Sequence, residues 1–475
     1  MTVAEIQTQS AAAARTPPGK KPTSPYVLLF CILVVAAIAT WIIPAGEFQR
    51  VLKDGVNFVV PGSLHAVPQH GVLPGRIFTA IATGVVNSAS IIFLILFTGG
   101  TLAVLEKTGT VAGALHRLSG ASRSGDLTVI VIVCAIFSLL GTLGIVANSV
   151  VAFVPLGLLI ASSMNLPVEF GVGLIYLGAY SGFNSAVLSP LTTGLSQRLA
   201  ELPLFSGMEL RAVVGLCFLL ATILFLAFYA RRCRARNIGA TMTQEQRAVS
   251  EKAAASQSAM SGAQWLALAL AAVSLVVFIV GTLRWKWGEP EMTAMFLIIA
   301  IGGGLICRMG PSEIADEFLR GSGKLVPGAF IVGLARAISI VLADGKILDP
   351  IVNTLSSFLE PLSPMVAAVG MFVSAAAMHV AISSGSGESA ALIPIFAPLG
   401  DALHLTRQVT VQSVLLGEGI MNCINPTSGV LMAVLATSGI AYGRWVRFVL
   451  PLVGAWFVIS VASLIVGVWI HWGPL

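Results

Sequence analysis

The sequence predicts an all-α polytopic membrane protein. The chain has 475 residues, of which 56% are hydrophobic and only 10% are charged, whereas soluble domains carry about 25% charged residues. Its mean hydropathy is +0.92, and apolar runs long enough to cross a bilayer recur along the chain. We expect about nine transmembrane helices and a pair of opposed re-entrant hairpins, arranged as an inverted structural repeat.

Charge and cysteine content exclude several other classes of protein. The net charge of +6 comes from basic residues scattered between apolar runs, which is typical of cytoplasmic loops and not of nucleic-acid binding. The six cysteines are dispersed without a C-x-x-C motif, so neither a disulfide framework nor a metal site is predicted. No His-Glu-x-x-His or ATP-binding motif is present. We expect no catalytic residue and no cofactor, and H⁺ and Na⁺ both stay open as coupling ions.

The first half of the chain is expected to begin in the cytoplasm. Residues 1–25 are predicted to be a disordered basic tail, and Tyr26–Ile43 a retained first span, because many further spans follow it. The first repeat then covers 26–230. Its expected elements are an exposed loop at 45–75 with a strand at 58–60, an amphipathic interfacial helix at 76–86, spans at 88–105 and 210–229, a hairpin at about 127–163 and a broken span at 170–199.

A polar linker at 231–262 is expected on the cytoplasmic side, between the halves. An extra helix at 263–283 follows, and the second repeat covers 291–470. Its expected elements are a span at 292–307, an amphipathic stretch at 311–323, a span at 325–342, a hairpin at about 365–402, a broken span at 409–438 and a final span at 445–470.

A shift of 239 positions relates the two halves. It places Pro155 on Pro394, Leu166 on Leu405 and Gly178 on Gly417. The extra helix turns the second half upside down relative to the first, and this topology puts most basic clusters in inner loops. Inverted repeats with discontinuous helices are typical of secondary transporters that bind their substrate near the bilayer midplane.

Polar residues that interrupt apolar runs are the candidate site. Irregular backbone at membrane depth survives only where it lines a cavity or is buried in protein, and a broken helix offers N–H groups to anions and carbonyls to cations. For the hydroxyl and amide side chains, helix capping is the alternative role. The candidates for substrate or ion binding are Asn148, Ser149, Ser189, Thr192 and Thr193 in the first half, and Ser384, Ser386, Glu388, Glu418, Asn425, Thr427 and Ser428 in the second.

Charged residues within the spans are the sharpest candidates. A carboxylate at the centre of a membrane helix costs about 2.5–3.5 kcal/mol or more, so Glu388 and Glu418 should face a cavity or a partner. Each could bind a substrate amine or a proton, and the two could share one cation; the alternative for Glu388 is a shallow hairpin that leaves it in water. Arg336 could contact a substrate carboxylate or instead pair with Asp344 or cap carbonyls. His379 could relay protons or be a hydrogen-bonded packing residue.

Several segments resemble the YfcC-type transporters, which are grouped with arginine/ornithine antiporters and anaerobic four-carbon dicarboxylate carriers. The matching segments are Ser384-Gly385-Ser386-Gly387, Thr406–Val409, Pro426–Ala433, Leu202–Gly207 and Gly333–Ser339. The resemblance covers nearly everything after residue 26. It implies the ion-transporter superfamily fold, with scaffold and transport domains, a homodimer and elevator-like movement.

The charge of the candidate site departs from that family. A glutamine is common at the position of Glu388, an asparagine at Ser189 and an aspartate at Glu418, and adjacent acids often replace Asn148 and Ser149. We predict a multi-pass secondary transporter of the bacterial inner membrane, with the lipid bilayer and a small-molecule substrate as its partners. Two intramembrane acids without paired arginines favour an amino acid, with a basic one as an option. The alternatives are a four-carbon dicarboxylate carrier, a membrane enzyme or a channel.

Overall fold

The computed structural model describes residues 25–473 except 54, 55, 61, 112, 114–125, 145, 147, 148, 186, 237–259 and 286. Residues 1–24 of the predicted tail and most of the polar linker lie outside the described residues.

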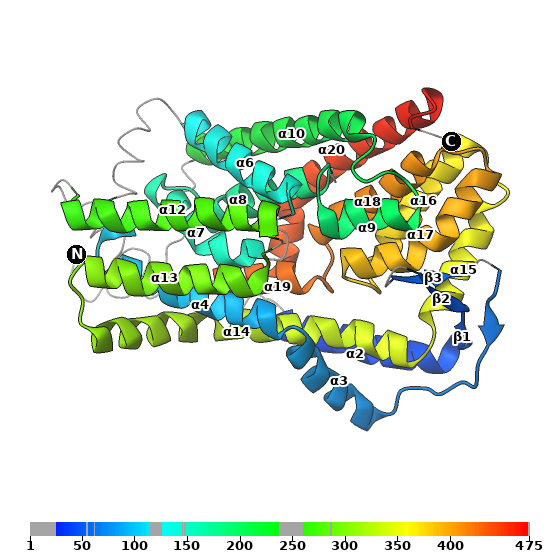
Figure 1. Ribbon diagram of the computed structural model, residues 1–475, viewed down its shortest axis with the longest axis horizontal. Coiled ribbons are helices and arrows are strands. Elements are labelled where there is room, and N and C mark those ends of the chain that lie inside the picture. The colour runs from blue at the N-terminus through cyan, green and yellow to red at the C-terminus, as the bar shows by residue number, and fades with distance from the viewer. Residues whose placement is uncertain are drawn as a thin grey trace, which may run out of the picture.

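Helices make up most of the described chain (Figure 1). In the first half these are α2 (Pro25–Ile42), α3 (Pro74–Asn87), α4 (Ala89–Lys107), α6 (Asp126–Thr142), η2 (Ser149–Phe153), α7 (Val154–Ser163), α8 (Val168–Phe183), η3 (Pro190–Gly194), α9 (Leu195–Leu199) and α10 (Met208–Ala235). In the second half they are α12 (Gly262–Trp285), α13 (Glu289–Ile306), α14 (Pro311–Asp344), α15 (Leu348–Leu359), α16 (Pro364–Met378), α17 (Gly385–Ala402), α18 (Arg407–Asn422), α19 (Gly429–Ser438) and α20 (Tyr442–Trp469).

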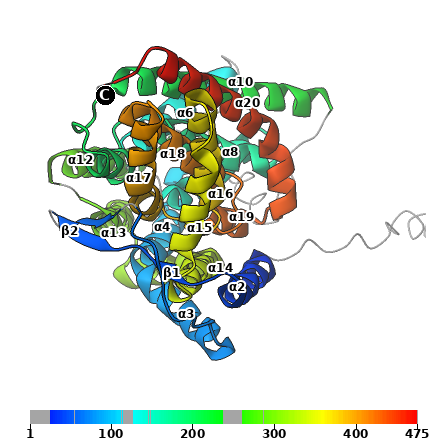
Figure 2. The ribbon, with the colours of Figure 1, turned by 90° about the vertical axis from the view of Figure 1, so that its right-hand side faces the viewer.

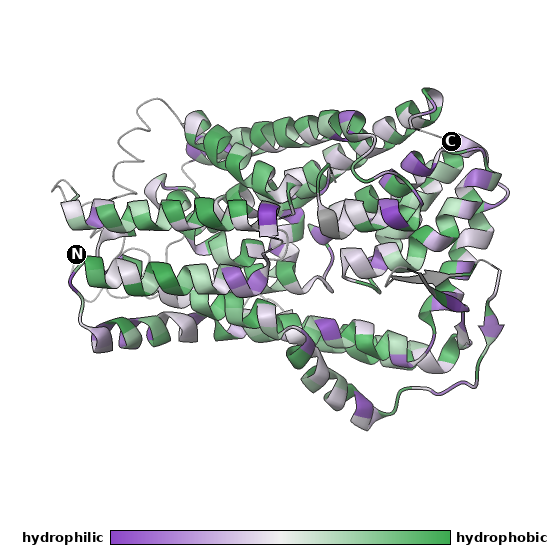
Figure 3. Ribbon diagram, in the orientation of Figure 1, coloured by the Kyte–Doolittle hydropathy of each residue, from purple (hydrophilic) through white to green (hydrophobic). Residues whose placement is uncertain are grey.

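Five of the described helices, α4, α10, α13, α14 and α20, are long and apolar enough to cross a membrane. Hydrophobic residues, in green, make up much of α10 and α13 in Figure 3. Shorter apolar helices of 10–17 residues lie at most of the other predicted spans and hairpin legs. The chain is therefore a multi-pass, mainly helical membrane protein. The number of nine spans stays a prediction.

Helix α14 differs from the expected pattern. An amphipathic stretch at 311–323 and a separate span at 325–342 were predicted, but the structure has one helix of 34 residues with Pro327 inside it. A proline removes only one intrahelical hydrogen bond, and membrane helices tolerate this where neighbours stabilise the freed groups. The carbonyl that loses its intrahelical donor is that of Gly323, which is exposed, whereas the hydroxyl of Tyr26 donates to the carbonyl of Pro327 itself. The 239-residue shift places Ser88 on Pro327. The corresponding helices of the first half, α3 and α4, are separate and meet at Ser88.

The breaks fall where polar residues predicted them. Helices α16 and α17 are separated by residues 379–384, and α18 and α19 by residues 423–428. Both bounds of α18 lie 239 residues after those of α8. Helix α15, which follows α14, was not predicted, because twelve amphipathic residues between two long apolar runs give a weak signal. In the end view, α16, α17 and α18 lie between α10 and α20 on one side and α14 on the other (Figure 2).

Glycines allow pairs of helices to pack backbone against backbone. A Cβ on Gly99 of α4 would lie 2.9 Å from the carbonyl oxygen of Gly321 in α14, and one on Gly321 would lie 2.3 Å from that of Gly99. Gly157 of α7 and Gly171 of α8 approach each other in the same way. Small residues at helix interfaces favour association in membranes because they permit close van der Waals contact.

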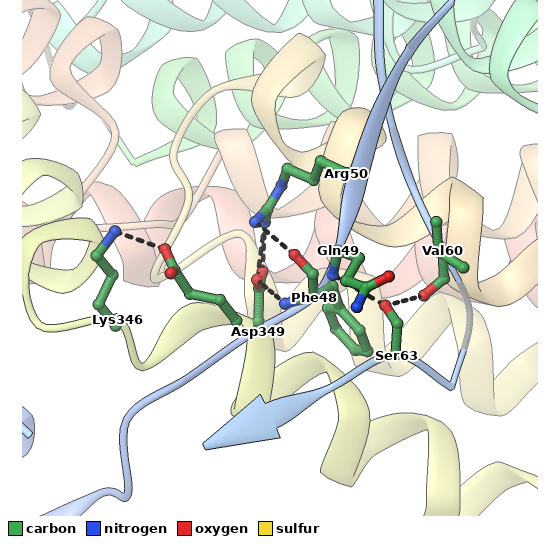
Figure 4. A network of polar contacts seen from close by, with 8 residues as sticks. Phe48, Gln49, Arg50, Val60, Ser63, Lys346 and Asp349 are labelled. Carbon is green, nitrogen blue, oxygen red and sulfur yellow. Dashed lines mark hydrogen bonds and ion pairs between the residues drawn. The ribbon is translucent and has the colours of Figure 1, made fainter. Parts of the chain in front are cut away.

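A loop with short strands connects α2 to α3 and packs against α15. Strands β1 (Gly46–Glu47) and β4 (His65–Ala66) pair, as do β2 (Arg50–Lys53) and β3 (Val56–Val59), so the strand predicted at 58–60 is present one or two residues earlier. Asp349 of α15 accepts hydrogen bonds from the Phe48 N–H at 2.9 Å and from Arg50 at 2.7 Å (Figure 4). Lys346 donates to Glu47, and this hydrogen bond lowers the pKa of Glu47.

This network gives a test of the fold. We expect Asp349→Ala to lower the free energy of unfolding by about 1–3 kcal/mol, because the Phe48 N–H and Arg50 lose a buried charged acceptor. Glu47→Gln, which alters a more exposed pair, should cost about 0–1 kcal/mol. Thermal unfolding of the purified full chain in detergent measures both. Equal shifts for the two variants would contradict the role assigned to Asp349.

Candidate functional site

The Ser-Gly run predicted in the second hairpin forms the start of α17. Ser384 is its N-cap and accepts a hydrogen bond from the Gly387 N–H at 3.4 Å. Glu388 follows in the first turn, where the positive end of the helix dipole favours a carboxylate. Its side chain is 0% exposed, so the alternative that left Glu388 in water is wrong. Ser384 is half-buried and Ser386 is exposed.

His379 is the partner of Glu388. Its Nδ1 lies 2.6 Å from Oε2 of Glu388, and both side chains are completely buried. The helical break places them together, because His379 ends the first leg of the hairpin and Glu388 begins the second. His379 is buried and hydrogen-bonded, as the packing alternative expected, and its partner is the acid that the sequence singled out.

Glu418 of α18 lies against the start of α17. A Cβ on Gly385 would be 1.8 Å from Oε1 of Glu418, so a larger residue there would force this carboxylate to move. Glu418 is 1% exposed, and neither of its carboxylate oxygens has a hydrogen-bond partner among the described residues. It interacts electrostatically with both Glu388 and His379. The structure thus brings the two predicted acids and the histidine into one buried cluster.

Asn184 extends this cluster from the first half of the chain. It follows the last residue of α8 and is 0% exposed, and the Cys423 thiol, a weak hydrogen-bonding group, is its side-chain neighbour. Neither of its polar side-chain atoms makes a well-aligned hydrogen bond with the described residues. A Cβ on Gly419 would lie 2.9 Å from its Oδ1, which places it beside Glu418. The sequence-based candidates did not include Asn184. Its position in a polar interruption of an apolar helix could have identified it.

Three aromatic side chains stabilise the end of α18. The Tyr176 hydroxyl donates to the Asn422 carbonyl at 2.9 Å. Trp445 Nε1 donates to the Cys423 carbonyl at 2.9 Å, and the Tyr442 hydroxyl donates to the Ile424 carbonyl at 2.5 Å. The sequence suggested that carbonyls at this break could hold cations. Instead, these three have protein donors.

Side chains in the break between α18 and α19 donate hydrogen bonds to the break between α16 and α17. Asn425 Nδ2 donates to the His379 carbonyl and the Thr427 hydroxyl to the Val380 carbonyl, each at 2.9 Å. Ser428 caps α19 and accepts from the Leu431 N–H at 3.4 Å. These contacts match the capping alternative, and they position the backbone that carries His379.

The first-half candidates are buried near the first hairpin or against α17. Ser149, Ser189, Thr192 and Thr193 are all buried, whereas Asn148 lies outside the described residues. The Ser189 Oγ would be 3.0 Å from a Cβ on Gly144, so Ser189 lies against the turn that follows α6. Thr192 Oγ1 has no hydrogen-bond partner in the described chain. Ser196 of α9 donates to Ser389 of α17 at 2.8 Å, which links the halves directly.

Arg336 lies outside the buried cluster. It is exposed on α14 and forms no hydrogen bond or ion pair with the described residues. The pairing with Asp344 that the sequence allowed is not formed, because Arg76 binds Asp344 at 2.7 Å. Near it along α14, Ala335 contacts Gly429 at the start of α19, and Ser339 donates to the Ala381 carbonyl at 3.2 Å. Arg336 therefore lies on the part of α14 that contacts both breaks.

The contact between Gly385 and Glu418 can be tested without any ligand. We expect Gly385→Ala to lower the free energy of unfolding by about 1–3 kcal/mol, as is typical of overpacked sites. Glu418→Asp should relieve part of that loss, because the shorter side chain withdraws the carboxylate. Gly454→Ala is the control, since nothing lies within 4 Å of a Cβ at that helical position. Additive effects of Gly385→Ala and Glu418→Asp in a double-mutant cycle would show that the two positions do not touch.

Two relatives align over almost the whole chain. The chain is 26% identical over 480 residues to the "Putative basic amino acid antiporter YfcC" of Escherichia coli (strain K12), with 91% of this chain and 94% of the relative covered. It is 24% identical over 492 residues to an uncharacterized protein of Haemophilus influenzae, with 94% and 96% covered.

Solved structures of two transporters are also similar to this chain. Neisseria gonorrhoeae MtrF, described as illuminating a class of antimetabolite efflux pumps, matches with a TM-score of 0.45 and 16% identity, covering 95% of this chain and 96% of that one. The Alcanivorax borkumensis YdaH transporter matches with a TM-score of 0.44 and 13% identity, covering 95% and 100%.

A family model places the chain in a transporter family. The model described as "DcuC: C4-dicarboxylate anaerobic carrier" matches residues 23–469, which is most of the chain. This match agrees with the resemblance found in the sequence, whose group includes the anaerobic four-carbon dicarboxylate carriers. The chain belongs to the C4-dicarboxylate anaerobic carrier family of membrane transporters.

Proposed function

We propose that the protein is a secondary active transporter that moves a small polar metabolite across the bacterial inner membrane. The observation that carries this proposal is a pair of buried acids, Glu388 and Glu418, beside two interrupted helices. Ionisable groups at membrane depth mark substrate and ion pathways, and interrupted helices are typical of transporter sites. Coupling to H⁺ or Na⁺, as symport or antiport, would supply the energy.

An amino acid, with a basic one as the first to test, is the proposed substrate. Neither Glu388 nor Glu418 forms an ion pair with a lysine or arginine of the described chain. Such a cluster would repel a dianion and attract an ammonium group. The name of the E. coli relative, a putative basic amino acid antiporter, agrees with this choice.

A four-carbon dicarboxylate is the second candidate substrate. The family is described as C4-dicarboxylate carriers. In addition, Arg336 is exposed on α14 without a protein partner among the described residues, and a guanidinium is well suited to bind a carboxylate. The exposed Ser386 and half-buried Ser384 at the start of α17 are the candidates that a substrate could reach without a rearrangement.

The proposed mechanism is elevator-like alternating access between a scaffold and a transport domain. In support, α2, α3, α4, α12, α13 and α14 pack mainly on one another, whereas α16, α17 and α18 pack together and on α20. The matching bounds of α8 and α18 support an inverted repeat with opposed hairpins. A homodimer and a cytoplasmic N-terminus complete the proposal.

Transport assays in proteoliposomes test both substrate classes. We expect accumulation or exchange of arginine or ornithine under an imposed proton or sodium gradient, and weaker transport of succinate and malate. Preferential transport of succinate or malate would select the dicarboxylate alternative. If none of a broad set of metabolites showed gradient-dependent or exchange transport, the proposed function would be wrong, and conductance without saturation would indicate a channel.

Substitution of Glu388 tests the role of the buried acid. Glu388→Gln keeps the shape but removes the ionisable group, so we expect transport to fall about tenfold or more, since hydrogen bonds to charged groups contribute roughly 1.5–3 kcal/mol. The remaining transport should also lose part of its pH dependence. Glu360→Gln, at an exposed acid after α15, is the matched control. Wild-type kinetics of Glu388→Gln at every pH would remove Glu388 from the mechanism.

A further inference from the structure

We propose that Glu388, His379, Glu418 and Asn184 form a closed proton-binding compartment, and that the coupling ion of this transporter is the proton. The inference rests on the proposed function, because it identifies the ion that would drive transport. It separates this buried compartment from the exposed part of the site near Ser386, where the substrate would first bind.

The compartment is defined by buried polar atoms that lack partners. Among the described residues, three such atoms are carboxylate oxygens, both of Glu418 and Oε1 of Glu388. Nε2 of His379 and the Asn184 amide meet Asn422 and the Cys423 thiol, but neither contact is a well-aligned hydrogen bond. All four side chains are at most 1% exposed. Buried polar groups are almost always hydrogen-bonded, so this concentration within one cluster indicates a ligand and not a packing defect.

The charges require that the ligand be positive. If both carboxylates were ionised and His379 were neutral, the cluster would carry two buried negative charges, and no lysine or arginine of the described residues binds either acid. Isolated buried charges are too costly to persist, and two carboxylates that share a site do not both ionise. The compartment therefore takes up cationic charge whenever it is closed.

The surroundings favour a proton over a sodium ion. Among the described residues, no group of three or more His, Cys, Asp or Glu side chains is arranged to hold a metal ion. The nearby carbonyls of residues 422, 423 and 424 accept hydrogen bonds from aromatic side chains. A proton needs only one acceptor, and the 2.6 Å contact between His379 Nδ1 and Glu388 Oε2 is short enough to hold one between the two groups.

The other groups that face the cluster do not supply this charge. From α8 they are the phenols Tyr176 and Tyr180, of which Tyr180 interacts with Glu418. After α18 it is the Cys423 thiol, beside Asn184. From η3, α9 and the rest of α17, the polar neighbours among the described residues are hydroxyls such as Ser196 and Ser389. The acids and His379 are thus the groups that bind and release the proton.

Infrared spectroscopy of the full chain in lipid tests this inference without a substrate. At neutral pH we expect the carbonyl stretching band of a protonated carboxyl group, which is distinct from the carboxylate bands. Glu388→Gln and Glu418→Gln should each reduce this band, and Glu418→Asp should shift its position. The amide band in the same spectrum shows whether each variant is folded.

A matched control comes from another buried acid. Glu169 is 2% exposed but pairs with Arg444, so Glu169→Gln should leave the protonated-carboxyl band unchanged. Replacing choline chloride in the buffer with sodium chloride should also leave the protonated-carboxyl band unchanged.

Three results would overturn the inference. The first is the absence of a protonated-carboxyl band at neutral pH. The second is full retention of this band, at an unchanged position, in all folded Glu388 and Glu418 variants. The third is loss of the band when sodium is added, which would show a sodium site. Substrate transport without this band would overturn only the inference. The band without transport of any metabolite would instead overturn the proposed function.

Discussion

Every backbone group released by breaking a helix inside the protein must find a partner, and the rest of this structure depends on that constraint. At the end of α18, three consecutive carbonyls accept hydrogen bonds from Tyr176, Trp445 and Tyr442, which come from α8 and α20. At the hairpin, Asn425 and Thr427 satisfy the carbonyls of His379 and Val380. Non-helical backbone at membrane depth persists only when it is buried and paired in this way.

Because the backbone is satisfied by neutral side chains, the acids are left for another role. Glu388 and Glu418 approach each other from α17 and α18, and Asn184 reaches them from the first half of the chain. The carbonyls at the breaks accept hydrogen bonds from neutral side chains. In contrast, both carboxylate oxygens of Glu418 and Oε1 of Glu388 have no hydrogen-bond partner among the described residues. Natural proteins rarely leave such atoms unpaired, and the exceptions mark places where a ligand binds and leaves.

The same packing explains why the cluster is so closed. Gly385 allows the Glu418 carboxylate to lie against the start of α17, and Gly417 allows α18 to approach the Phe372 carbonyl of α16. In membranes, small residues permit such close approach and van der Waals contact then holds the helices together. In the proposed elevator mechanism, this group would move as one body against α14, which carries Arg336.

The sequence alone determined the class of protein and the location of the breaks, because hydropathy, glycines and prolines act over short stretches of chain. It also identified Glu388, Glu418 and the resemblance to a transporter family. Tertiary structure decided the partners: His379 binds Glu388, Asn184 joins Glu418, α14 continues through Pro327, and Asp344 pairs with Arg76 and not with Arg336. Asn184 and Glu418 are far apart in sequence, and Asp344 and Arg76 are farther still. No local pattern encodes such pairs, because they arise only when separate helices pack in three dimensions.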